Sequence, residues 1–157
     1  MGINRGKTFE NKLKEQFEKI PDTLVLRLYD ITMGYSKINN PCDFIVFRNG
    51  TLNLFELKAI HGNTLNFNSH IRENQWNDLV KYDLYPGVNA GIIVWFIDLD
   101  KTFFIPGYDL NFAKYQNKKS FNAKTDYEGV YEIHGKKKKT FFDYDLDGFL
   151  KEVEYDK

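Results

Sequence analysis

Three charged residues lie in two neighbouring apolar segments that are predicted to be β-strands. Asp43 begins the first segment, and Glu56 and Lys58 lie near the end of the second. The dipeptide Asn49-Gly50 between them is typical of a two-residue hairpin turn. Counting back from that turn along both strands places Asp43 directly opposite Glu56, with Cβ atoms about 5 Å apart. Because alternate residues of a strand share a face, Lys58 lies beside Glu56.

This arrangement favours a metal site in a hydrolytic enzyme. Like charges directly opposite each other destabilise a sheet, so a carboxylate pair in otherwise apolar strands invites a cation. Carboxylate oxygens suit Mg²⁺ or Mn²⁺. A metal held by Asp43 and Glu56 would acidify a water molecule and polarise a phosphate, while Lys58 would offset developing negative charge. The alternative is a surface patch in which Lys58 neutralises Glu56, but the opposed Asp43 favours the metal site.

The elements that must position these residues follow from the apolar periodicity. The expected order is a helix, three strands, a helix, two strands and a short last helix, at residues 7–20, 23–29, 43–48, 51–58, 69–85, 91–97, 102–105 and 147–153. Residues 30–40 are expected to be a loop, and Asn68 or Ser69 to cap the second long helix. The apolar run at 91–97 suits a central strand covered on both faces. We therefore expect one domain over residues 1–157 with an α/β fold, a central mixed β-sheet flanked by helices.

The composition limits the class of protein. The chain carries 22 basic and 22 acidic side chains, and this zero net charge counts mildly against a nucleic-acid-binding protein. Charge can still be segregated, because Lys136 to Lys139 form a basic block and residues 143–157 are acid-rich. The single cysteine, Cys42, excludes an intrachain disulfide and argues against a zinc site. The longest apolar run, residues 90–97, is too short to span a bilayer, so we expect a cytoplasmic protein without membrane contact.

The three charged residues also resemble a nuclease signature. Pro41-x-Asp43, followed after a hairpin by Glu56-Leu57-Lys58, resembles the PD-(D/E)xK motif. Further segments between Arg5 and about Pro106 resemble one branch of that superfamily, the RecU-type Holliday-junction resolvases. These segments are Arg5-Gly6-x-x-Phe9-Glu10, Asn68 to Gln75, Gly91 to Phe96 and Phe103 to Pro106.

The resemblance implies a restriction-endonuclease-like fold and a role for each matching residue. Asp43, Glu56 and Gln75 would bind Mg²⁺ (or Mn²⁺), and Lys58 would act with them in catalysis. Gln75 would complete the coordination or orient the water, although without the resemblance it would be taken for an exposed helix residue. Glu10 is a candidate for an outer-shell role near a second metal, with a surface carboxylate as the alternative.

The resemblance also implies the substrate and the assembly. The substrate would be branched DNA, in particular four-way junctions, cut during recombination by a homodimer that brings two sites to a symmetric junction. A compact resolvase would suit a phage, acting in the host cytoplasm. The alternatives are another PD-(D/E)xK nuclease of restriction or repair, or a DNA-binding protein that has kept the fold without the chemistry.

The chain departs from the family at two places. Pro41 stands where family members have a threonine, and only residues 30–41 are available where the family carries a longer insertion that projects into the junction. The basic side chains expected to contact DNA are Arg5, Lys37, Lys136, Lys137 and Lys138. The lysine block could equally be a solvated turn.

The acidic end of the chain offers a different interpretation. Asp143, Asp145, Asp147 and Glu154, with Gly148 between them, match the EF-hand calcium-loop pattern. An EF-hand loop needs a helix on each side, and only three residues follow Glu154. We therefore favour a capped acidic helix over a calcium loop.

Overall fold

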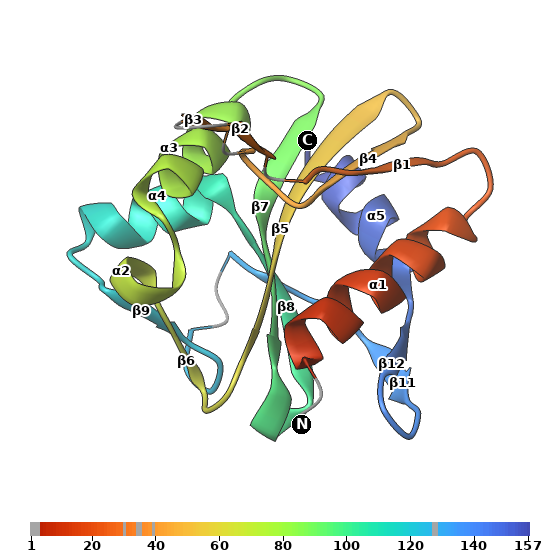
Figure 1. Cartoon of the computed structure of the whole chain (residues 1–157). Coiled ribbons are helices and arrows are strands. Elements are labelled where there is room, and N and C mark those ends of the chain that lie inside the picture. The colour runs from red at the N-terminus through yellow and green to blue at the C-terminus, as the bar shows by residue number, and fades with distance from the viewer. Residues whose placement is uncertain (1–3, 30, 34–35, 39, 127–128) are drawn as a thin grey trace.

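A six-stranded mixed β-sheet forms the centre of the protein (Figure 1). The computed structural model describes residues 4–29, 31–33, 36–38, 40–126 and 129–157. In order across the sheet, the strands are β1 Leu24–Arg27, β4 Phe44–Arg48, β5 Thr51–Ile60, β7 Val88–Phe96, β8 Lys101–Pro106 and β10 Tyr131–Glu132. β5 and β7 run parallel, and the other neighbouring strands run antiparallel. The expected α/β fold with a central mixed sheet is confirmed.

The turn between β4 and β5 sets the register of the strands that carry the candidate site. Asn49 and Gly50 have φ values of 50° and 75°, and positive φ at both positions is the geometry of a type I′ turn. Arg48 pairs with Thr51 at the turn, and the same register continues to the end of β4. The predicted two-residue hairpin is therefore confirmed over β4 and the facing part of β5.

Helices cover both faces of the sheet. In Figure 1, α1 (Arg5–Glu18) and α5 (Leu146–Tyr155) lie to the right of the sheet, and α3 (Glu73–Tyr82) and α4 (Gly107–Tyr115) lie to its left. Two separate apolar cores result, one around Leu13 and Phe17 of α1 and the other around Leu79 of α3. Every residue of β7 after Val88 is buried, as expected for a central strand covered on both faces.

The single helix expected over residues 69–85 is wrong, because two helices occupy this segment. α2 (Phe67–His70) ends before Ile71, whose extended backbone (φ −124°, ψ 123°) separates it from α3. Asn66 caps α2 in place of Asn68 or Ser69, since its side chain accepts hydrogen bonds from both of their backbone N–H groups. Ile71 is buried in the core, so tertiary packing overrides the helical periodicity.

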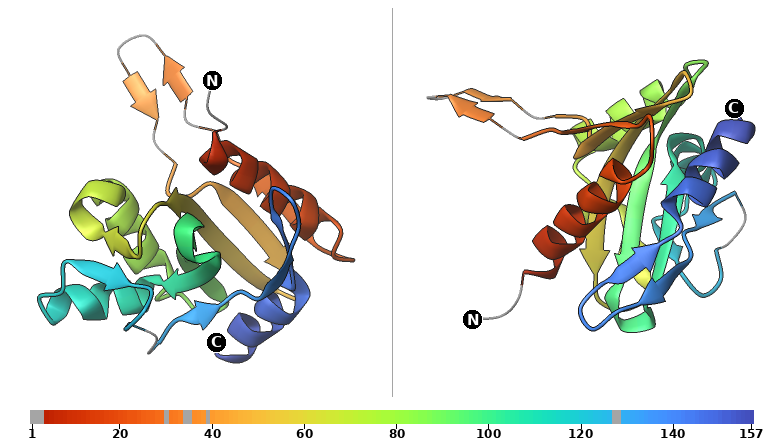
Figure 2. Two further views of the ribbon diagram at one scale, coloured as in Figure 1. Left: turned by 90° about the horizontal axis from the view of Figure 1, so that it is seen from below. Right: turned by 90° about the vertical axis from the view of Figure 1, so that its right-hand side faces the viewer.

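A β-hairpin occupies most of the segment that was expected to be a loop at residues 30–40. β2 (Ile31–Met33) pairs antiparallel with β3 (Ser36–Ile38). Figure 2 shows these two strands projecting away from the sheet. Strands of three residues are too short to show an alternating pattern in the sequence, which is why the prediction failed here.

The second half of the chain adds short elements that the periodicity did not indicate. Besides α4, they are β6 Thr64–Asn66 paired with β9 Ser120–Asn122, β11 Gly135–Lys137 paired with β12 Phe142–Tyr144, and a 3₁₀ turn at Ile97–Leu99. The β6–β9 pair lies beside α2, and the β11–β12 hairpin lies near α1 (Figure 1).

The acidic segment near the C-terminus is a capped helix, as favoured above. The Asp145 side chain caps α5 by accepting a hydrogen bond from the backbone N–H of Gly148 at 3.0 Å. Asp147 and Glu154 both bind the buried guanidinium of Arg48. These carboxylates therefore anchor α5 to the hairpin that ends in Asn49-Gly50.

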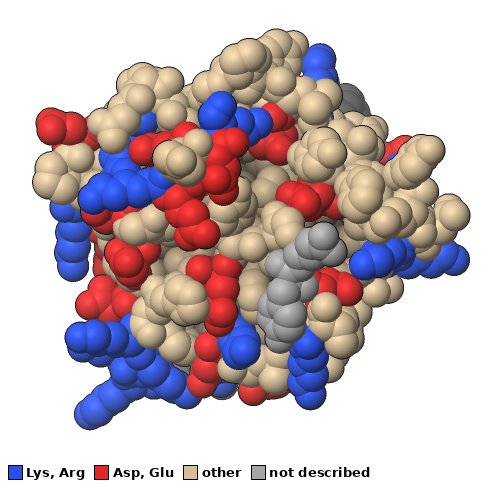
Figure 3. Space-filling model, turned by 180° about the vertical axis from the view of Figure 1, so that it is seen from behind, with Lys and Arg blue, Asp and Glu red and all other residues tan. Residues whose placement is uncertain are grey.

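Charge is unevenly distributed over the surface despite the net charge of zero. Figure 3 shows acidic side chains gathered across the face seen from behind, with lysine and arginine mainly at its rim. This face is unsuited to the DNA backbone. No helix in the described part of the chain is long and apolar enough to cross a membrane.

Candidate active site

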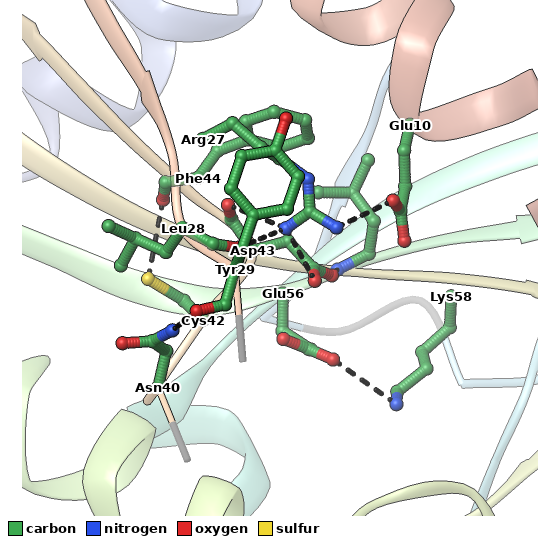
Figure 4. Close-up of polar contacts among 11 residues, drawn as sticks. Glu10, Arg27, Leu28, Tyr29, Asn40, Cys42, Asp43, Phe44, Glu56 and Lys58 are labelled. Carbon is green, nitrogen blue, oxygen red and sulfur yellow. Dashed lines mark hydrogen bonds and ion pairs between the residues drawn. The ribbon is translucent and has the colours of Figure 1, made fainter. Parts of the chain in front are cut away.

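The predicted site residues come from three elements that meet on one side of the sheet. Glu56 and Lys58 lie on β5 opposite Ile92 and Val94 of β7, and these two neighbours belong to the core on the α3 side. Gln75 is buried on the inward face of α3. Asp43 immediately precedes β4. Figure 4 shows Asp43, Glu56 and Lys58 close together, with Glu10 of α1 approaching from above.

Asp43 was predicted to be the first residue of its strand, but it lies outside the regular ladder, one residue before β4 begins at Phe44. Its backbone N–H donates to the carbonyl of Phe55 at 3.0 Å, so the two-residue register does not extend to a direct pair with Glu56. The Asp43 carboxylate instead accepts a hydrogen bond from the backbone N–H of Leu57 at 2.8 Å. An aspartate side chain that replaces a ladder bond in this way is a known competitor of strand pairing.

Arg27 of β1 binds both Asp43 and Glu10. Its Nη1 lies 3.1 Å from Asp43 Oδ1, and its Nη2 lies 2.8 Å from Glu10 Oε2. The same guanidinium donates to the carbonyl of Leu28 at 2.6 Å and lies over the ring of Phe44. The sequence analysis missed this residue, although the alternation of β1 puts Arg27 on the face opposite its leucines.

Glu56 is the most deeply buried carboxylate of the site, with a relative exposure of 4%. Its Oε1 forms an ion pair with Lys58 Nζ at 3.2 Å. Burial, and secondly repulsion from Asp43, raise the pKa of Glu56 to about 7, against the opposing effects of Lys58 and Gln75. At neutral pH this side chain is therefore poised between its acid and its carboxylate form.

Two oxygen atoms at this position are buried and accept no hydrogen bond from any described residue. They are Oε2 of Glu56 and Oε1 of Gln75. An amide oxygen, and a carboxylate oxygen in the ionised form, can only accept, and each is costly to bury without a donor or a cation. Both belong to the residue types that bind Mg²⁺ and similar hard cations, so the donor set fits a divalent metal.

The carboxylates of the site do not form a complete set of metal ligands in the described part of the chain. Within the described ranges, no three His, Cys, Asp or Glu side chains form a group that could hold a metal ion. In Figure 4, Asp43 is directed to Arg27. Binding of a metal by both carboxylates would require Asp43 to exchange part of its contact with Arg27.

Glu10 lies at the edge of the site. Its pKa is raised by burial, then by Asp43, while Arg27 lowers it. The ion pair with Arg27 joins Glu10 to Asp43. The structure thus places Glu10 beside the predicted metal ligands, as an outer-shell role would require.

Comparison with protein families identifies the family to which this chain belongs. Residues 16–145 match the family described as Recombination protein U, RecU. The chain belongs to the RecU family. The matched segment contains Arg27, Asp43, Glu56, Lys58 and Gln75, whereas Arg5 and Glu10 precede it.

Two further comparisons place this RecU family member among other proteins. Among solved structures, the chain is similar to Hjc of Archaeoglobus fulgidus, described as a Holliday junction resolvase from an archaeal hyperthermophile. The sequence identity is 18%, the match covers 66% of this chain and 78% of the other, and the TM-score is 0.48. A comparison with curated proteins found no match.

The basic residues that were expected to contact DNA lie in two places in this RecU family member, four near the start of α1 and on or beside β11, and Lys37 on β3. Arg5 and Lys137 border one cavity at the beginning of α1. Lys136 and Lys138 are exposed on and beside β11. Lys37 lies on β3, where its backbone pairs with Thr32 and its side chain lies outside the described part.

Proposed function

We propose that this protein is a metal-dependent endonuclease that resolves four-way DNA junctions, with Asp43, Glu56, Lys58 and Gln75 as its catalytic residues. One observation carries the metal assignment: two acceptor oxygens, Glu56 Oε2 and Gln75 Oε1, are buried without donors among the described residues, next to the ammonium of Lys58. Membership of the RecU family supports branched DNA as the substrate.

The residues of the site divide the work. Mg²⁺ or Mn²⁺, when bound by Asp43, Glu56 and Gln75, supplies Lewis-acid chemistry toward a phosphodiester. Lys58 holds Glu56 in place, and its ammonium offsets negative charge that develops on the attacked phosphate. Arg27 fixes the orientation of Asp43 through its guanidinium. The buried position of Glu56 excludes water from its carboxylate and strengthens every charge interaction there.

The projecting β2–β3 hairpin supports junction binding by this chain. Its second strand ends at Ile38, five residues before Asp43 in the sequence, and the hairpin extends beyond the body of the sheet (Figure 2). A homodimer would present two such hairpins and two active sites to the two-fold symmetric centre of a junction. We infer that paired cuts require this dimer.

Cleavage of a labelled four-way junction tests the proposal. The comparison is with a linear duplex of the same sequence, with Mg²⁺, with Mn²⁺ and with EDTA. We expect paired nicks in the junction with either metal and none with EDTA. Equal cutting of the linear duplex would favour a restriction or repair nuclease instead, and junction binding without cutting under all conditions would favour a non-catalytic DNA-binding protein.

A further inference from the structure

A cavity of about 280 Å³ lies at the N-terminal end of α1, on the opposite face of the sheet from Glu56 and Lys58. Its walls come from three separate parts of the chain. They are the first turn of α1, the strand pair β7–β8 with Trp95 and the turn residue Asp100, and the segment from Lys137 to Phe142 in the β11–β12 hairpin. Figure 1 shows the beginning of α1 and this hairpin at the same lower end of the molecule. We refer to it as the Arg5 cavity.

The indole of Trp95 borders the Arg5 cavity with an unused donor. Trp95 is 7% exposed, and its Nε1 is buried without a hydrogen-bond partner in the described part of the chain. A buried indole N–H normally finds an acceptor. The missing partner is therefore an acceptor atom, and Trp95 is one of the residues that line the cavity.

The other polar groups around the Arg5 cavity are nearly all cations or hydroxyl groups. They are Arg5, Lys137, Lys139, Thr8 and Thr140, and the one carboxylate among the lining residues is Asp100. Asp100 is already ion-paired with Lys137. Among the described residues, the side chains of Arg5 and Lys139 form no hydrogen bond or ion pair, and Arg5 has a longer-range attraction to Asp98, so both cations can still contact a ligand.

The helix that ends at this cavity adds to its positive potential. α1 has 14 residues and carries no acidic residue in its first turn, where Arg5 and Lys7 are found instead. Helix N-termini favour negative charge, so cations there are unfavourable unless an anion lies close by. The N-cap residue Asn4 already accepts a hydrogen bond from the backbone N–H of Lys7, so the features that favour an oxyanion are the cations of this turn and the unpartnered indole N–H of Trp95.

We propose that the Arg5 cavity binds one phosphate group of the DNA backbone while the substrate occupies the active site. The inference rests on the proposed function, because it takes the bound DNA as the source of the phosphate. α1 links the two places: Glu10, which reaches the active site through Arg27, follows Arg5 by about 7 Å along the helix axis.

Nuclear magnetic resonance of the indole groups tests ligand binding directly. The chain has two tryptophans, so a Trp76→Phe variant assigns the Trp95 indole signal without altering the cavity. We expect this signal to move downfield as the N–H gains an acceptor, both with sodium phosphate and with a four-way junction in EDTA. Sodium chloride at the same ionic strength is the control for phosphate.

Junction binding by charge variants tests the source of the phosphate. The double variant Arg5→Ala/Lys139→Ala should bind the junction about tenfold more weakly than the wild type in EDTA. The slope of log Kd against log salt should fall by about 1 for each lost contact. Lys124→Ala, which removes an exposed lysine distant from the cavity lining, should behave as wild type.

The outcomes separate this inference from the proposed function. A Trp95 signal that moves with phosphate but not with DNA would overturn the assignment to the DNA backbone. A signal unmoved by both, with the double variant binding as Lys124→Ala does, would overturn the site itself. If the wild type bound junctions with the predicted Trp95 shift but never cut them, the proposed nuclease activity would fail while the phosphate site stood.

Discussion

The two carboxylates at the centre of the candidate site have opposite environments. Asp43 is fully engaged, with one oxygen on Arg27 and the other on the backbone N–H of Leu57. Glu56 has one oxygen on Lys58 and the other buried without a donor among the described residues. Groups of the protein thus bind both oxygens of Asp43. In contrast, Oε2 of Glu56 and Oε1 of Gln75 have no partner among the described residues.

This difference indicates how the site is prepared for a cation. A carboxylate bound by an arginine and a backbone amide is held in place, so Asp43 is kept near Glu56 before any metal arrives and must exchange part of its contact with Arg27 to bind the ion. Burial raises the pKa of Glu56 to about 7. A positive charge placed against its unpartnered Oε2 would stabilise the ionised form of this side chain the most. We therefore expect Asp43 to matter for geometry and catalysis, Arg27 for holding that geometry, and Glu56 for the response to pH.

The largest expected effect is the loss of cleavage in Asp43→Ala. Removing this carboxylate deletes a proposed metal ligand, so the rate of junction cleavage in Mg²⁺ should fall by about 10³-fold or more. Binding of the junction in EDTA should remain within about twofold of the wild type, because phosphate contacts made elsewhere dominate affinity. The same change at an exposed acid, Glu15→Ala, should leave both measurements unaltered. Normal cleavage by Asp43→Ala would contradict the assignment.

Arg27→Ala tests how much the ion pairs of Arg27 with Asp43 and Glu10 stabilise the protein. The variant leaves Asp43 and Glu10, partly buried and close together, without their shared cation. We expect the free energy of unfolding at pH 7 to fall by about 2 kcal/mol, measured by urea denaturation. Lys12→Ala removes an ion pair with Glu15 that is largely exposed and should cost less than about 1 kcal/mol. Equal losses in the two variants would show that Arg27 has no special structural role.

Glu56→Gln tests the environment of the buried Glu56 carboxylate through the pH dependence of stability. The pKa of Glu56 rises from 4.5 to about 7 on folding, so the native state binds the proton more tightly. This contribution to stability is fully present below about pH 4.5 and is lost as the pH rises through about 7. Between pH 5 and pH 8 in EDTA, the wild type should lose about 2 kcal/mol more than Glu56→Gln. If the free energy of unfolding changed with pH in the same way in both proteins, burial would not raise the pKa of Glu56 as described.

The parts of the site that could be predicted from sequence are those fixed by local rules. The Asn49-Gly50 turn determines the β4–β5 register, and strand alternation puts Glu56 and Lys58 on one face. Asp43 departs from that register because its side chain takes the N–H of Leu57, a choice that depends on its neighbours in space. The predicted register therefore places the two carboxylates in the same site, but the predicted direct pair of Asp43 with Glu56 is wrong.

Other features depended on contacts between distant segments. Arg27 meets Asp43 only because β1 pairs with β4, a pairing that periodicity does not specify. The burial of Gln75 follows from the break at Ile71, which sets a new start for α3. The short strands and α4 in the second half of the chain had no clear period, since each spans too few residues or lies half in the core.

A crystal of the wild type soaked in Mn²⁺ would identify the metal ligands, because anomalous scattering locates the ion without assuming what binds it. We expect a Mn²⁺ peak within coordination distance of oxygen atoms of Glu56 and Gln75, with Asp43 turned from Arg27 toward the ion. A fully soaked crystal with no anomalous peak between Asp43 and Glu56, or with manganese bound by other residues, would contradict this expectation.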